Sequence, residues 1–390
     1  MAGANPHVAA VAPPPIPEAR LWPARYDGRL GPVLDLTQAV PGYPAPPELV
    51  ARIGAASTDP ESFRYGHITG DAALREAYAD DLNALYGGDV LPDEVAITTG
   101  ANMASFAVTM ALAAAGDAVM LPVPWYFNHQ MNAAMLGIGV VPLPCRPEDA
   151  FLPDPDRAEA LLTDRTKAIL LVTPNNPTGA VYPPATIARF ADLCRRRGIA
   201  LVLDETYRDF RPAGLARPHD LLADPAWRDT VVQLYSFSKS YCVPGYRAGA
   251  IVAGPAVMDG LAKILDCLQI CAPRVGQAAL AWAIPALAGW REDNRALMNA
   301  RGEAADRAFA TLPGWTLGSR GAYFAYARHP FGDRPALDVA RDLAERQGIV
   351  TLPGSAFGPG QDGYLRLAFA NVEPDALTDM ARRLGFIAVR

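Results

Sequence analysis

Lys239 is the residue whose type and surroundings point most clearly to covalent chemistry. The 390-residue sequence contains three lysines, Lys167, Lys239 and Lys263, among 35 basic residues, so the other 32 are arginines. An arginine stays protonated in a protein, whereas a partly buried lysine can lose its proton, attack a carbonyl carbon and form a Schiff base. Lys167 begins an apolar strand and Lys263 lies on an expected helix, and both are ordinary positions for a solvated lysine. Lys239 is therefore the candidate nucleophile.

The neighbours of Lys239 indicate which carbonyl it attacks. It lies within residues 235–247, Tyr-Ser-Phe-Ser-Lys-Ser-Tyr-Cys-Val-Pro-Gly-Tyr-Arg. Ser236 and Ser238 offer hydroxyl groups, and Arg247 offers a guanidinium, which together suit a phosphate group. A phosphate-bearing carbonyl that condenses with lysine describes pyridoxal phosphate.

Composition and charge favour a globular protein with small-molecule partners. Only 19% of the residues are charged, and the net charge of −6 gives no electrostatic reason to expect nucleic acid or a membrane surface. The N-terminus lacks a basic region followed by an apolar core, so we expect no signal peptide. The five cysteines, including Cys242 beside the lysine segment, lack paired metal spacing. We expect reduced thiols, no metal and a cytoplasmic location.

Short apolar runs alternate with helical patterns from residue 94 onward. The runs at 95–99, 168–173, 199–203 and 231–234 are typical of an α/β fold with a mostly parallel sheet covered by helices on both faces. Ligands of such folds bind at the carboxyl ends of the strands. The residues expected there are Gly100, Trp125, Tyr126, Asn176, Asp204 and 236–239.

The sequence also predicts how the chain divides into an arm and two domains. Residues 1–30 begin with an Ala- and Pro-rich stretch and are expected to form a flexible arm. Residues 48–285 are expected to form the large ligand-binding domain. Residues 31–47 and 286–390, the N-terminal segment and the C-terminal third, are expected to form a smaller α/β domain.

Several motifs in this order resemble a known family. Asn175-Asn-Pro-Thr-Gly179 and Asp204-Glu-Thr-Tyr207 each follow an expected strand, and Lys239 and Arg247 follow at the matching spacing. Together they resemble the class I/II aminotransferases, pyridoxal-phosphate enzymes of the aspartate aminotransferase fold (fold type I). The resemblance extends from about Leu34 to Leu384.

The resemblance implies a role for each cofactor-binding residue. Asp204 holds the proton on the pyridine nitrogen, and Asn176 and Tyr207 donate hydrogen bonds to the phenolic oxygen. Lys239 forms the Schiff base at rest and then moves the substrate proton. The phosphate is held by Gly100, Ala101, Asn102, Ser236, Ser238 and Arg247, the first three at a helix N-terminus.

The segment Pro124-Trp-Tyr-Phe-Asn-His129 resembles the family segment that stacks an aromatic ring on the pyridine. The match favours Tyr126 for that role, with Trp125 as the alternative. His129 matches a histidine that supports the pyridine-binding aspartate in some members. The competing interpretation is a structural histidine on a helix, with its hydrogen bonds satisfied there.

The resemblance also implies substrate and partner contacts. Arg366, in Tyr364-Leu-Arg-Leu-Ala, matches the arginine that forks the substrate α-carboxylate. Tyr65 matches a tyrosine that reaches the phosphate of a neighbouring subunit, which implies a homodimer. Asn176 and Ala39 complete the expected substrate contacts. Ala39-Val-Pro departs from the Gly-x-Pro usual at this place, and Gly42 is a candidate to replace the lost glycine.

The expected activity is transfer of an amino group between an L-amino acid and a 2-oxo acid. Another fold-type-I enzyme, such as a C–S lyase, a cyclopropane-forming synthase or a decarboxylase, is the alternative. A non-catalytic ligand sensor is disfavoured because the N-terminal arm is too short for a DNA-binding module. The substrate side chain is left open. Dicarboxylate-specific members often use an extra arginine from the partner subunit, for which Arg274 and Arg20 are the possible substitutes here. Trp22, Tyr43 and Trp125 near the expected entrance suit a neutral or aromatic group.

Overall fold

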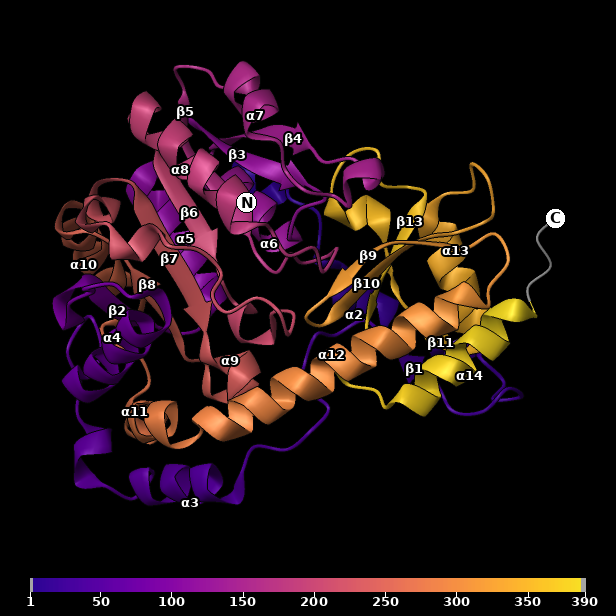
Figure 1. The fold of residues 1–390 in the computed structure, drawn as a ribbon, viewed down its shortest axis with the longest axis horizontal. Helices are drawn as coiled ribbons and strands as arrows, with labels where there is room; N and C mark the ends of the chain where they lie inside the picture. The colour runs from indigo at the N-terminus through magenta and orange to yellow at the C-terminus, as the bar shows by residue number, and fades with distance from the viewer. Residues whose placement is uncertain (1–2, 387–390) are drawn as a thin grey trace.

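A seven-stranded sheet forms the centre of the larger of two α/β units (Figure 1). The computed structural model describes residues 3–386. In sheet order the strands are β2 (Val95–Thr98), β8 (Gly249–Val252), β7 (Val231–Ser236), β6 (Ala200–Asp204), β5 (Thr166–Val172), β3 (Ala118–Val123) and β4 (Gly139–Pro144). Every neighbouring pair is parallel except those that involve β8. The carboxyl ends of β5, β6 and β7 therefore meet at one edge.

Helices cover both faces of this sheet. One face packs against α5 (Ala101–Leu112), α6 (Phe127–Met135) and α10 (Pro255–Gln269). The other packs against α4 (Ala72–Tyr86), α8 (Pro184–Arg197) and α11 (Arg274–Ala286). The short α7 (Pro155–Leu161), α9 (Phe237–Ser240) and the outer α3 (Pro47–Ala56) complete the unit. Burial on both faces explains why the strands read as continuous apolar runs.

The smaller unit contains two separate sheets. The antiparallel sheet has the order β12 (Leu352–Pro353), β13 (Tyr364–Ala368), β10 (Phe324–Arg328) and β9 (Thr316–Gly321). The parallel pair joins β1 (Leu34–Asp35) to β11 (Ile349–Val350), which brings the N-terminal segment to the C-terminal third. Helices α13 (Ala336–Asp342) and α14 (Pro374–Gly385) belong to this unit, and α12 (Ala288–Ala310) runs from one unit to the other (Figure 1). The domain boundaries at 48–285 and at 31–47 with 286–390 stay predictions.

The expectation that residues 1–30 form a flexible arm is wrong for residues 15–22. Residues 6–9 form α1 (Pro6–Ala9) and residues 15–19 form α2 (Pro15–Ala19). Ala19 and Trp22 are buried in the core of the smaller unit, beside the partly buried Ile16. The many prolines concealed these spaced apolar residues, which bury enough area to hold the segment in place.

The two units touch through backbone at a pair of glycines. Gly179 ends the loop after β5 with φ +74°, and a Cβ atom there would lie 2.2 Å from the backbone nitrogen of Gly321 on β9. A Cβ atom on Gly321 would in turn lie 2.2 Å from the carbonyl oxygen of Gly179. Only glycine permits this approach, which sets the loop carrying Asn176 against the smaller unit.

Within residues 3–386, no helix combines the length and the apolar character that crossing a membrane requires.

We expect Gly179→Ala to destabilise the protein far more than Gly198→Ala. Both glycines have positive φ (+74° and +63°), so both substitutions cost about 1 kcal/mol of backbone strain. A Cβ atom on Gly198 would meet no atom within 4 Å, whereas one on Gly179 would meet backbone, which adds roughly 1–3 kcal/mol of overpacking. Thermal unfolding of the two variants checks this. Equal losses of Tm would contradict the close backbone contact.

Candidate active site

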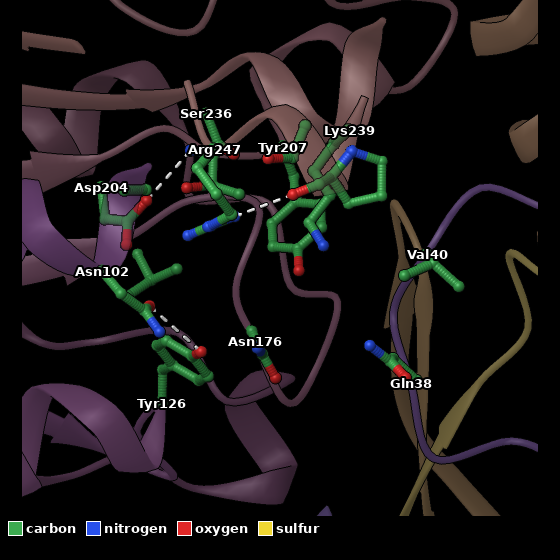
Figure 2. Close-up of a pocket in the computed structure, with 15 residues that line it drawn as sticks. Gln38, Val40, Asn102, Tyr126, Asn176, Asp204, Tyr207, Ser236, Lys239 and Arg247 are labelled. Carbon is green, nitrogen blue, oxygen red and sulfur yellow. Dashed lines mark hydrogen bonds between the residues drawn. The ribbon is translucent and has the colours of Figure 1, made fainter. Parts of the chain in front are cut away.

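A cavity of about 250 Å³ opens where strands β5, β6 and β7 end (Figure 2). Figure 2 shows Gln38 and Val40 across the cavity from Asp204 and Asn102. The lining residues are Gln38, Val40, Ala101, Asn102, Tyr126, Val172, Asn176, Asp204, Thr206, Tyr207, Ser236, Ser238, Lys239, Pro244 and Arg247. Ten of the residues singled out in the sequence thus lie together, because strand ends from distant segments meet at one edge of the sheet.

Lys239 lies partly buried at the wall of this cavity. It follows β7 on the short helix α9, and its Nζ donates a hydrogen bond to the carbonyl oxygen of Ala39. Burial, followed by the positive charges of Arg247 and Arg366, lowers the pKa of Lys239 from 10.5 to about 8. A substantial fraction of the amine is therefore neutral near physiological pH, as a nucleophile requires.

Asp204 presents a buried carboxylate at the end of β6. His129, on α6, places its Nε2 3.1 Å from Oδ2, and the backbone N–H of Thr206 donates to Oδ1 at 3.0 Å. Burial alone would raise the pKa of Asp204, but the His129 contact and the Thr206 hydrogen bonds outweigh it and lower the pKa. The group stays negative and can hold a proton on a basic ring nitrogen in the cavity.

The start of α5 forms an anion cradle with Arg247. Gly100 precedes the helix with φ +82°, and a Cβ atom there would lie 2.2 Å from Nη2 of Arg247. Ala101 and Asn102, the first two residues of the helix, line the same cavity as Arg247. The hydroxyl of Ser238 is buried and has no hydrogen-bond partner among residues 3–386. Helix amides, a guanidinium and a spare hydroxyl suit a phosphate dianion.

Arg366 lies on β13 and is not among the residues that line the cavity, but it contacts Asn176, which is. Its Nη1 donates to Oδ1 of Asn176 at 3.1 Å, and Nη2 donates to the carbonyl oxygen of Thr37. Its guanidinium carbon lies 5.2 Å from the ring centres of both Phe324 and Phe357. Burial lowers the pKa of Arg366 to about 10, so the group is still charged at neutral pH.

The aromatic residues divide between the cavity and the core. Tyr126 lines the cavity, donates to Oδ1 of Asn102 at 3.3 Å and packs perpendicular to His129. Trp125 is absent from the lining and lies against Gly358. Tyr207 lines the cavity and packs edge-on against Tyr323 and Phe324, while burial raises its pKa above the usual range of a tyrosine.

The expected aromatic entrance is wrong in this structure. Trp22 is buried in the core of the smaller unit, and Tyr43 packs edge-on against Trp290. None of Trp22, Tyr43 and Trp125 lines the cavity, because each packs against apolar or aromatic residues elsewhere.

Neither Gly42, the expected substitute glycine, nor Arg274 lines the cavity of its own chain. Gly42 packs on the backbone of Asn371, where a Cβ atom would lie 2.8 Å from the Asn371 Cα, rather than facing the cavity. Arg274 lies in a separate hollow with Tyr65, where it pairs with Asp71 at 3.2 Å.

Tyr65 does not reach the cavity of its own chain. Its side chain is 79% exposed at the surface, beside Phe63, which is also 79% exposed. Arg20, the other candidate for a dicarboxylate, bonds to Gln38 and pairs with Asp35 at 3.4 Å.

Sequence reasoning missed five lining residues, Gln38, Val40, Val172, Thr206 and Pro244. Thr206 could be predicted from the sequence, because an aspartate side chain commonly accepts a hydrogen bond from the backbone N–H two residues later, which forms a turn. Gln38 and Val40 lie in an irregular segment without periodicity, so only their packing against the other unit reveals them.

Three kinds of comparison agree on the relatives of this chain. The family model described as aminotransferase class I and II matches residues 31–384. The aromatic aminotransferase ISS1 of Arabidopsis thaliana is 30% identical, with 90% of this chain and 88% of that protein aligned. The arginine–pyruvate transaminase AruH of Pseudomonas aeruginosa is 31% identical, with 83% of this chain and 82% of that protein aligned. A double mutant of Thermus thermophilus aspartate aminotransferase has the same fold, with a TM-score of 0.90, 24% identity and 99% coverage of both chains.

We expect acetylation of Lys239 by acetic anhydride to be half-maximal near pH 8 in protein freed of bound small molecules. Only the neutral amine reacts, and burial beside Arg247 and Arg366 lowers its pKa to about 8, so reactivity appears as the pH rises through that value. Arg247→Gln removes one positive charge and moves the midpoint to higher pH. Peptide mass mapping measures the reaction, since the chain has three lysines to distinguish. A midpoint near 10.5 would contradict the effect of burial.

Proposed function

The chain belongs to the class I and II aminotransferase family, and we propose that it transfers an amino group at the Lys239 site with pyridoxal phosphate as its cofactor. It is a transaminase. The proposed donor is an L-amino acid, which leaves as its 2-oxo acid, and a second 2-oxo acid takes the amino group.

One observation carries this proposal: Lys239, with its lowered pKa, lines the same cavity as a buried carboxylate and an anion cradle. The residues present fit pyridoxal phosphate. The spare Ser238 hydroxyl and the helix start beside Arg247 suit its phosphate, and Asp204 suits its ring nitrogen. Tyr126 supplies an aromatic ring in the same wall.

The chain's own groups perform binding, orientation and proton transfer. When bound, pyridoxal phosphate supplies a carbonyl carbon for an amine and a ring that withdraws electrons from the substrate α-carbon. Asp204, held by His129 and Thr206, keeps a proton on the ring nitrogen. Lys239 gives and takes the substrate proton through Nζ, because its pKa of about 8 lies near physiological pH.

Arg366 is the proposed anchor of the substrate α-carboxylate. A planar guanidinium binds a carboxylate with two parallel hydrogen bonds. Asn176 already accepts a hydrogen bond from Nη1, which sets the plane of the guanidinium. The carbonyl of Ala39, the partner of Lys239, belongs to the segment that crosses the site from the smaller unit.

We also propose that two copies of the chain form a homodimer in which Tyr65 completes the partner's phosphate site. Its exposure, together with that of Phe63, supports a role outside its own chain.

Free cysteines dispersed over the sequence support a cytoplasmic location. The relatives named above are an aromatic aminotransferase and an arginine–pyruvate transaminase, which supports an amino acid as donor and a 2-oxo acid as acceptor.

Lys239→Ala tests the proposal, with Lys263→Ala as the matched control. Lys263 lies exposed on α10, so its removal should leave turnover unchanged. Loss of Lys239 removes the proposed nucleophile and proton carrier and should lower kcat by about a thousandfold or more. Oxo acid formation from pooled amino acids, with a 2-oxo acid as acceptor, measures both variants. Equal turnover in the two variants would overturn the assignment of the site.

A further inference from the structure

The helix that carries Lys239 cannot hold its own position. Helix α9 has four residues, Phe237–Ser240, and a single helical turn has almost no stability by itself. The N–H of Phe237 donates to the carbonyl of Ala248 at 3.2 Å, and the carbonyl of Lys239 accepts from the hydroxyl of Tyr323 at 3.3 Å, so few backbone hydrogen bonds link this helix to other segments. Other contacts must therefore keep Lys239 in place.

Asp209 supplies such contacts from outside the cavity. The hydroxyl of Ser240, the residue after Lys239, donates to Oδ2 of Asp209. The hydroxyl of Tyr235, on β7, lies 2.6 Å from the same oxygen and 3.0 Å from the Ser240 hydroxyl. All three side chains are buried, and none lines the cavity. The carboxylate thus joins the residues on both sides of the lysine segment.

Two arginines balance the buried charge of Asp209. Arg291 places Nη1 3.3 Å from Oδ1 of Asp209 and Nη2 2.9 Å from Asp81. Arg208 is fully buried, bonds to Asp81 and lies over the ring of Tyr235 at 4.4 Å. Two arginines and two aspartates form a neutral cluster. Such a cluster is costly to break, because removal of one member leaves a partner charged and buried.

The cluster joins three separate parts of the fold. Asp81 lies on α4, Asp209 follows the segment of Asp204 and Tyr207, and Arg291 lies on α12, the helix that runs between the two units (Figure 1). Through Asp209, contacts therefore run from Arg291 on α12 to Ser240, the residue after the lysine.

We infer that Asp209 is a positioning residue that ties the Lys239 helix to α12 through Ser240, Tyr235 and Arg291. This inference rests on the proposed role of Lys239 as the reacting amine. Asp209 touches neither cofactor nor substrate; it sets where the amine lies. Arg366, on the other unit, keeps its own contacts, so substrate binding does not depend on Asp209.

Three variants and one matched control test the inference. Tyr235→Phe, Ser240→Ala and Asp209→Asn each weaken the connection. Tyr86→Phe is the control, because Tyr86 is buried and donates to the buried carboxylate of Glu205 at 2.6 Å, the same distance as in the Tyr235 contact. Tyr235→Phe and Tyr86→Phe therefore lose the same kind of bond. If Asp209→Asn fails to fold, the two milder variants still decide.

We expect kcat to fall by about tenfold or more in Tyr235→Phe and Ser240→Ala while KM changes less than about twofold, since a displaced reacting group slows the reaction without weakening binding. Amide hydrogen exchange of residues 237–241, measured on the full chain as purified, should become faster in both variants. Tyr86→Phe should show neither change.

Variants of Tyr235 and Ser240 that match Tyr86→Phe in kcat would overturn the inference, whatever their hydrogen exchange. A rise in KM equal to the loss in kcat would overturn it as well, because the role would then be substrate binding. Failure of the proposed function is distinguishable from both outcomes, since it appears as retained turnover in Lys239→Ala.

Discussion

The burial of one amine beside two guanidinium groups is the constraint on which the site depends. Lys239 lies in the cavity wall near Arg247 and Arg366, and burial with these charges lowers its pKa to about 8. The arrangement costs free energy, because a buried amine loses its hydration while its nearest charges repel its protonated form. The surrounding fold must therefore hold these groups together against their own electrostatics. Charge that is unfavourable for folding is favourable here for nucleophilic chemistry and for binding anions.

The sheet and the segment between units provide that support. Parallel strands bring Asp204 and the lysine segment to one edge, and α5 adds its N-terminal amides. The smaller unit contributes Arg366 from β13 and the segment of Ala39, which contacts Lys239 directly. The glycine contact between Gly179 and Gly321 sets the two units at a fixed separation beside Asn176. The neutral cluster around Asp209 holds the lysine helix through Ser240 and Tyr235.

Much of the fold and of the cavity wall follows from the sequence. Apolar runs predict the strands, and the polar residues after them predict which side chains meet, so Asp204, Asn176 and Lys239 are foreseeable. Trp22 and Ala19 are not, because a Pro-rich segment conceals how few apolar residues suffice to hold it against a core. Gln38 lies in an irregular segment whose path is set only by the opposite unit. The Asp209 cluster joins residues far apart in the chain, and no local pattern distinguishes these charges from surface ones.

Transfer of an isotopically labelled amino group tests the central claim most directly. The purified protein is incubated with amino acids labelled with nitrogen-15 and with an unlabelled pool of 2-oxo acids. Our account predicts that the label appears in new amino acids, in amounts equal to the 2-oxo acids formed from the donors. Release of the label as ammonia, or loss of carbon dioxide or a thiol without transfer, would contradict it and would make the site that of a lyase or a decarboxylase.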